Sequence, residues 1–150
     1  MRYTCLIFLF TIVFASIASA ENGLINVKSS RTVKETADRL ESVLKEKGMT
    51  VFARIKHSDG AEKVGVDLRP TELVIFGNPK VGAPLMKCNQ TVGIDLPQKA
   101  LIWKDDTGQV WLTYNDPQYL SKRHGLSACA EVIAKVEKAL GNFAKAATKP

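Results

Sequence analysis

A short apolar run, Leu73–Phe76, constrains the fold of this chain more than any other feature of its sequence. The run is apolar on both faces and too short for a packed helix, which is typical of a strand that is covered on both sides. Pro70 precedes it and cannot lie inside a β-ladder, so the strand begins after that residue. The turn sequence Gly77-Asn78-Pro79 ends it. We therefore expect a central, fully covered strand over Thr71–Phe76, with the other elements arranged around it.

The first twenty residues have the pattern of a cleaved secretory signal peptide. Arg2 supplies a positive charge, Cys5–Ile17 is apolar, and Ala18-Ser19-Ala20 is a small-residue cleavage pattern. No later run is long enough to cross a bilayer. We expect cleavage after Ala20, a mature chain over 21–150 without a stable membrane anchor, and a periplasmic or secreted location.

The remaining roughly 130 residues are enough for one ordinary domain with a real core. The formal net charge of the full chain is +6, and removal of Arg2 leaves 6 − 1 = +5. The lysines are dispersed, and no block of basic residues is interleaved with aromatic side chains. The sequence therefore argues against a nucleic-acid partner.

Periodicity predicts an α+β fold in the order β-α-β-β-β-β-α, with a single antiparallel-rich sheet and helices on one face. Thr32 and Glu35 form a capping box that starts the first helix. In the second strand, Val51, Ala53 and Ile55 are expected to share the apolar face. The other expected elements are strands over Leu24–Val27, Ala100–Lys104 and Gln109–Tyr114, short helices over Leu85–Asn89 (opened by Pro84) and up to His124, a last helix capped by Ser127, and a frayed tail over Ala144–Pro150.

Three phrases in the chain resemble the bacterial family called "domain of unknown function 302". They are LRPTELVIFGNPKVGAPLM, VGIDLPQKALIWKD and VWLTYNDPQYLSKRHGL, and the phrase TVFARIKHS upstream also fits. The resemblance extends from Gly23 to the last helix. It implies a TATA-binding-protein-like fold and a homodimer. No enzymatic activity is assigned to the family, so the resemblance leaves the function open. The element order expected from periodicity agrees with that fold.

Five residues at the ends of predicted strands are candidates for a ligand site. His57 lies where an apolar strand face meets a loop, so its imidazole is expected to be half-buried. It is either a structural histidine, hydrogen-bonded at the sheet edge, or a base, ligand or switch. Polar groups at strand ends, above an apolar groove, fix the orientation of ligands. The structural alternative is turn and capping chemistry, which is common for Asn before Pro. The candidate ligand-binding residues are His57, Asn78, Lys80, Tyr114 and Asn115.

Sulfur-containing side chains suggest a second kind of site. His57, Met86 and Cys88 offer soft ligands that suit copper(I), although Met and Cys also serve as core fillers. Cys88 and Cys129 survive signal cleavage in a compartment that permits a disulfide, and the sequence leaves open whether they are paired. His124 falls in the last turn of a short helix, where the helix dipole would stabilise a positive charge on its side chain.

Three functions remain open on the sequence alone. We favour an exported module that binds or senses a small ligand or metal, with a groove rimmed by His57, Asn78, Lys80 and Tyr114. The first alternative is a thiol-dependent enzyme or carrier in sulfur or redox chemistry that uses Cys88. The second is a homodimeric interaction protein without a ligand, recognisable by a large apolar patch. Short catalytic motifs such as G-x-S-x-G and HExxH are absent from the sequence, which favours binding over catalysis.

Overall fold

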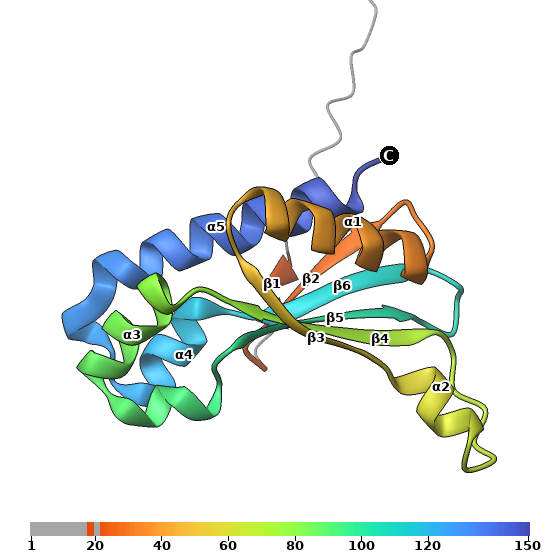
Figure 1. The fold of residues 1–150 in the computed structure, drawn as a ribbon, viewed down its shortest axis with the longest axis horizontal. Coiled ribbons are helices and arrows are strands. Elements are labelled where there is room, and N and C mark those ends of the chain that lie inside the picture. The colour runs from red at the N-terminus through yellow and green to blue at the C-terminus, as the bar shows by residue number, and fades with distance from the viewer. Residues whose placement is uncertain (1–17, 20–21) are drawn as a thin grey trace, which may run out of the picture.

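The computed structural model of this chain describes residues 18–19 and 22–150 (Figure 1). Most of the expected signal peptide, residues 1–17 and 20, lies outside the described residues. Ala18–Ser19, within the expected cleavage pattern, form a two-residue strand, β1, which pairs with the next strand.

One antiparallel sheet forms the base of the fold. Its order is β1-β2-β6-β5-β4-β3, and every neighbouring pair is antiparallel. The α+β class and the element order predicted from the sequence are therefore confirmed. The longer strands are β2 (Leu24–Ser29), β3 (Thr50–Lys56), β4 (Thr71–Gly77), β5 (Gln98–Lys104) and β6 (Val110–Asn115).

Two long helices, α1 (Val33–Glu46) and α5 (Ala130–Thr148), cover one face of the sheet (Figure 1). At one end of the sheet lies a group of short helices. At the opposite end a single short helix, α2 (His57–Glu62), extends away from the body of the protein. The group consists of α3 (Pro79–Cys88), η1 (Gln90–Ile94), α4 (Pro117–His124) and η2 (Ser127–Cys129).

The core lies between the sheet and the two long helices. The predicted capping box starts α1, because the Thr32 backbone N–H donates to Glu35 Oε2 at 3.0 Å and the Glu35 N–H donates to Thr32 Oγ1 at 3.2 Å. Along α1, Leu40 and Leu44 are fully buried against the sheet. Burial of this apolar stripe supplies most of the helix's stability, since propensity alone is weak.

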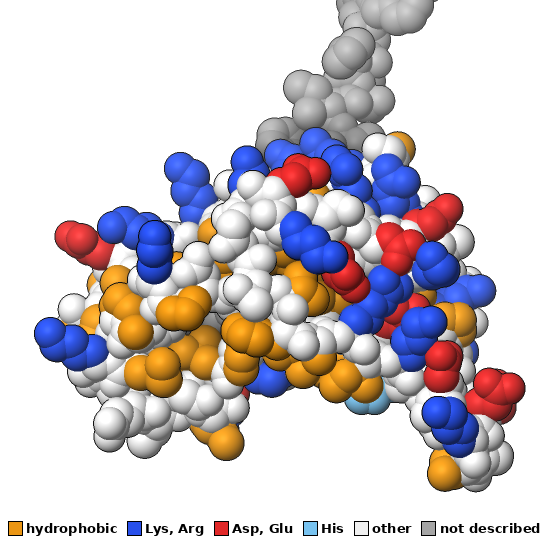
Figure 2. All heavy atoms as spheres, viewed as in Figure 1, with side chains coloured by type: hydrophobic (Ala, Val, Ile, Leu, Met, Phe, Trp, Pro, Cys, Tyr) orange, Lys and Arg blue, Asp and Glu red, His pale blue; other side chains and the backbone are white. Residues whose placement is uncertain are grey.

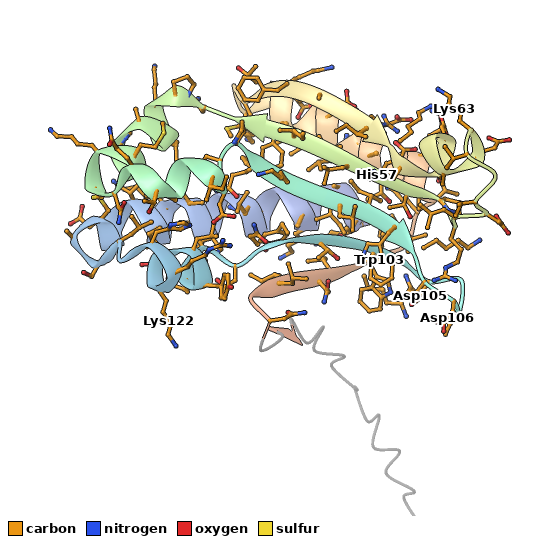
Figure 3. The ribbon with its side chains drawn as sticks, turned by 90° about the horizontal axis from the view of Figure 1, so that it is seen from below. His57, Lys63, Trp103, Asp105, Asp106 and Lys122 are labelled. Atoms are coloured by element: carbon orange, nitrogen blue, oxygen red, sulfur yellow. A yellow bond between two sulfur atoms is a disulfide. The ribbon has the colours of Figure 1, made fainter. Side chains whose placement is uncertain are left out.

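The expectation of a central strand covered on both sides is wrong. β4 is second from the β3 edge, and its side chains alternate between the two faces. Val74 and Phe76 are buried beneath the helices, whereas Leu73 and Ile75 are half-buried on the opposite face. No described helix covers the middle of that face, which we call the open face (Figure 3). Its apolar side chains are Ile55, Leu73, Ile75, Leu101, Trp103 and Trp111.

A β-bulge in β3 also changes the expected pattern. Val51 is opposite Phe76 on the helix-covered face, but the register shifts at Phe52 so that Ala53 is opposite Ile75 on the open face. The shared apolar face predicted for Val51, Ala53 and Ile55 is therefore wrong. An extra residue in one strand reverses the alternation of every residue that follows it.

The bulge turns Arg54 towards the helices. Its guanidinium contacts Glu72 on β4 and lies 2.6 Å from Asp38 Oδ1 and 3.3 Å from Glu41 Oε1 on α1. Hydrogen bonds from Lys34 and then from Arg54 lower the pKa of Asp38. This network joins the edge strand to the helix that lies above it.

Three other local predictions are corrected by the structure. α3 begins at Pro79, with Asn78 as its N-cap, so Pro84 lies inside that helix instead of opening it. Ser127 lies in η2 and does not cap α5. The tail is not frayed from Ala144, because α5 continues to Thr148, whose carbonyl oxygen accepts from the Ser30 N–H at 3.1 Å.

Candidate functional site

An apolar pocket of about 540 Å³ lies at the end of the sheet where the short helices gather. That volume falls within the range of small-molecule sites. Figure 2 shows apolar side chains gathered on this side of the molecule, over α3 and below α5. The walls come from α3, the η1–β5 connection and α5, and they include Val81, Leu85, Met86, Leu96, Val136 and Leu140.

The floor of the pocket depends on a glycine at the end of β4. A Cβ atom on Gly77 would lie 3.3 Å from Phe52 Cε2 and 3.4 Å from Pro97 Cβ. Both of those neighbours also line the pocket. A glycine here lets the strand end fit closely between Phe52 and Pro97, which are contributed by β3 and by the chain before β5.

Few polar side chains line this pocket. The side chain of Asn78 already makes hydrogen bonds within the protein. Its Oδ1 accepts from the Lys80 N–H at 2.9 Å, and its Nδ2 donates to the Gly48 carbonyl at 3.2 Å. Lys135 is exposed, and it is the only charged residue among the described residues that line the pocket. Gln98 is only 8% exposed, and its side-chain amide makes no hydrogen bond within the described part of the chain.

The five predicted ligand-binding residues do not gather at one place. Asn78 lines the pocket, and Lys80 is exposed two residues further along α3. Tyr114 is buried beneath α5, and burial raises the pKa of its phenol. Asn115 lies at the end of β6 opposite Leu24.

His57 lies far from the pocket and differs from its expected environment. It is exposed at the start of α2, at the end of the molecule opposite to α3 (Figures 1 and 3). The prediction of a half-buried imidazole is therefore wrong. The structure does not bring His57 to Met86 and Cys88, and the described residues contain no group of three His, Cys, Asp or Glu side chains that could hold a metal ion.

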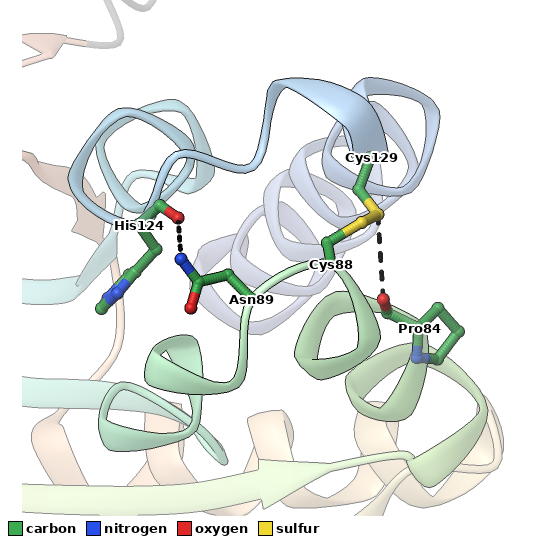
Figure 4. The surroundings of a disulfide bond; sticks show 5 residues. All are labelled: Pro84, Cys88, Asn89, His124 and Cys129. Atoms are coloured by element: carbon green, nitrogen blue, oxygen red, sulfur yellow. Dashed lines mark hydrogen bonds between the residues drawn. A yellow bond between two sulfur atoms is a disulfide. The ribbon is translucent and has the colours of Figure 1, made fainter.

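Cys88 and Cys129 form a disulfide (Figure 4). Their Cα atoms are 6.5 Å apart, and the bond joins the end of α3 to η2, immediately before α5. Both α3 and α5 form walls of the pocket. In this state Cys88 has no free thiol, so the thiol chemistry considered from the sequence would first require reduction.

A buried histidine fixes a third wall of the pocket. His124 Nε2 lies 2.6 Å from Asp95 Oδ2, and its Nδ1 lies 3.1 Å from Thr91 Oγ1. The Asn89 side chain donates to the His124 carbonyl at 2.8 Å (Figure 4). These contacts join η1 to the end of α4. His124 therefore has a structural role in addition to any interaction with the helix dipole.

Sequence reasoning expected an apolar groove, but it did not indicate the segments that line this pocket, and it missed Gln98. The pocket is assembled from segments that are distant in the chain, and no local periodicity reports such an assembly. One signal was present: Gln98 comes just before the predicted strand Ala100–Lys104, where it extends the buried row of Ala100 and Ile102.

The model of the family described as "Domain of unknown function DUF302" matches residues 25–143. The chain belongs to the DUF302 family. Its fold is similar to that of a crystal structure of an uncharacterized conserved DUF302 protein from Bacillus stearothermophilus, with a TM-score of 0.76 and 25% identity over 83% of this chain and 98% of that one. The family predicted from the sequence phrases is thereby confirmed.

Two Brucella proteins share a segment with this DUF302 chain. One from Brucella suis biovar 1 (strain 1330) and one from Brucella abortus biovar 1 (strain 9-941) are each named "Fluoride-specific ion channel FluC 1". Both are 47% identical over 115 residues, or 77% of this chain, but only 45% and 43% of their own lengths. The chain thus spans less than half of each of these relatives. Among the described residues, no helix combines the length and the apolar character needed to cross a membrane.

Proposed function

We propose that this DUF302 protein is an exported module that binds a small, largely apolar molecule in the pocket between α3, η1 and α5. The observation that carries the proposal is the pocket itself, about 540 Å³ of space lined almost entirely by apolar side chains. Exposed apolar surface in a concave site favours ligand binding because water leaves it at a gain in free energy.

The disulfide supports both parts of this proposal. Disulfides persist in oxidising compartments, which agrees with the secretory pattern at the N-terminus. The same bond ties together two walls of the pocket and so limits the entropy that these segments would lose on binding. We therefore propose a periplasmic or secreted location for the mature chain.

Filling the pocket is expected to abolish binding. The variant Ala139→Trp places an indole in the lining of the pocket, whereas Ala134→Trp places the same group on an exposed position of the same helix. With naphthalene as the probe, titration calorimetry is expected to show at least a tenfold loss of affinity for Ala139→Trp and no change for Ala134→Trp. Equal affinities for the two variants, or no binding of naphthalene to the unmodified protein, would argue against the proposal.

The name of the Brucella relatives suggests a second candidate, a role in fluoride handling. The apolar pocket does not favour it, since a small anion requires hydrogen-bond donors or cations. Thermal unfolding in sodium fluoride, with sodium chloride at the same concentration as the control, tests this candidate. On the pocket proposal we expect the two salts to give the same Tm, and stabilisation by fluoride alone would favour the second candidate.

A homodimer through the open face is a compatible proposal for the assembly. The face presents neighbouring apolar side chains from three adjacent strands, with Leu73 opposite Leu101 and Trp103 opposite Trp111. In a two-fold dimer the open face of one copy would pack against the open face of the other. The homodimer implied by the family resemblance would cover this surface.

A further inference from the structure

Gln98 occupies an unusual position for an amide side chain. It is the first residue of β5, and its partner across the ladder is Phe76 on the helix-covered face of β4. The residue is more than nine-tenths buried. Its side chain therefore lies on the helix-covered side of the sheet, and the residue lines the pocket together with Val136 and Leu140 of α5.

The Gln98 amide faces the open space of the pocket. No hydrogen bond to its side chain occurs within the described chain, yet no described side-chain nitrogen or oxygen is both fully enclosed and without a partner. Its amide atoms must therefore touch open space, and the open space that this residue lines is the pocket. An amide in such a place keeps one acceptor and one pair of donors free for a ligand.

We propose that Gln98 determines the class of ligand: an apolar molecule that carries one uncharged hydrogen-bonding group, such as a hydroxyl, ketone or carboxamide. This inference rests on the proposed function of the pocket. A poorly hydrated amide gains more from a hydrogen bond than an exposed one does, because little water must be displaced. A ligand that leaves it unpaired forfeits that gain.

The charges around the pocket favour an uncharged polar group over a charged one. Gln98 is neutral, and most of the residues that line the pocket with it are apolar, so an ionised group beside it would lose its hydration without an opposite charge. Lys135 is the cationic residue among the described lining residues. It is exposed, so its ammonium group remains hydrated. It disfavours ammonium ligands and contributes little to the binding of carboxylates.

Four probes of similar shape test this specificity. They are naphthalene, 2-naphthol, 2-naphthoate and 2-naphthylmethylammonium, each titrated into the full mature protein by calorimetry. We expect 2-naphthol to bind about tenfold more tightly than naphthalene and more tightly than either ion. In the Gln98→Leu variant we expect the affinity for naphthalene to be kept or improved and the preference for 2-naphthol to fall to about onefold.

The fold of the variant is checked by its thermal stability. Replacing an amide without a partner by an apolar side chain of similar size is expected to raise Tm or leave it unchanged. The matched control, Gln118→Leu, changes an exposed glutamine on α4 whose amide contacts Glu137, and it is expected to keep the tenfold preference.

If naphthalene and 2-naphthol bind equally well before and after Gln98→Leu, the assignment of Gln98 is overturned and the pocket proposal stands. Tighter binding of 2-naphthoate than of 2-naphthol also overturns the assignment, in favour of an anionic ligand. If no probe binds the unmodified protein, both proposals fail.

Discussion

Reduction of the Cys88–Cys129 disulfide is expected to lower the free energy of unfolding by about 4 kcal/mol. The bond closes a loop with a sequence separation of 41 residues, and opening that loop restores conformational entropy to the unfolded chain. For a domain of this size the loss corresponds to a fall in Tm of roughly 10 to 15 °C. Thermal unfolding with and without dithiothreitol measures it.

The double variant Cys88→Ser/Cys129→Ser serves as the control. It is expected to unfold near the Tm of the reduced protein and to be insensitive to dithiothreitol. Cys88 is exposed, and Cys129, which is half-buried against the core, keeps a side chain of similar size. A shift below about 1 kcal/mol on reduction would contradict this prediction. Naphthalene affinity measured on the reduced protein then tells whether the bond also organises the walls of the pocket.

Phe76→Ala is expected to destabilise the protein by about 3–5 kcal/mol. Phe76 is only 1% exposed and packs edge to face on Phe143 of α5, with ring centroids 6.5 Å apart. Removing the ring leaves a cavity between the sheet and the helix that the neighbouring side chains fill only in part. Urea unfolding followed by circular dichroism gives the change in free energy.

The neighbouring variant, Ile75→Ala, is the matched comparison because its side chain lies on the open face of the same strand. In a monomer we expect it to cost about 1 kcal/mol, since half-buried side chains lose less on truncation. If two copies pair through the open face, its cost will be larger and Tm will rise with protein concentration. Sedimentation of both variants separates the two cases, and a monomer at all concentrations would contradict the homodimer.

The sequence predicted the fold well where the signals were local. The capping box at Thr32 and the end of α4 at His124 are both confirmed. Each depends on residues that are close in the chain, where hydrogen-bond chemistry and turn geometry act directly. The order of strands and helices followed from these signals.

The candidate site was harder to predict because it depends on contacts between distant segments. The apolar run did not reveal that Leu73 and Ile75 lie on an uncovered face. A short run of apolar residues has the same sequence pattern whether one or both faces of the strand are covered. The bulge at Phe52 left no signal in the pattern of the second strand, and it changed the side on which Arg54 lies. The free amide of Gln98 is defined only by what surrounds it in space.

The bulge in β3 disfavours the pairing of this protein with the sheet of another molecule. β3 is an outer strand, and an outer strand is a template for the backbone of another chain. A bulge interrupts the regular spacing of its free amides and carbonyls, and an inward-pointing charged side chain, such as Arg54, also discourages pairing at an edge strand. Fibrillar growth from this edge is therefore disfavoured.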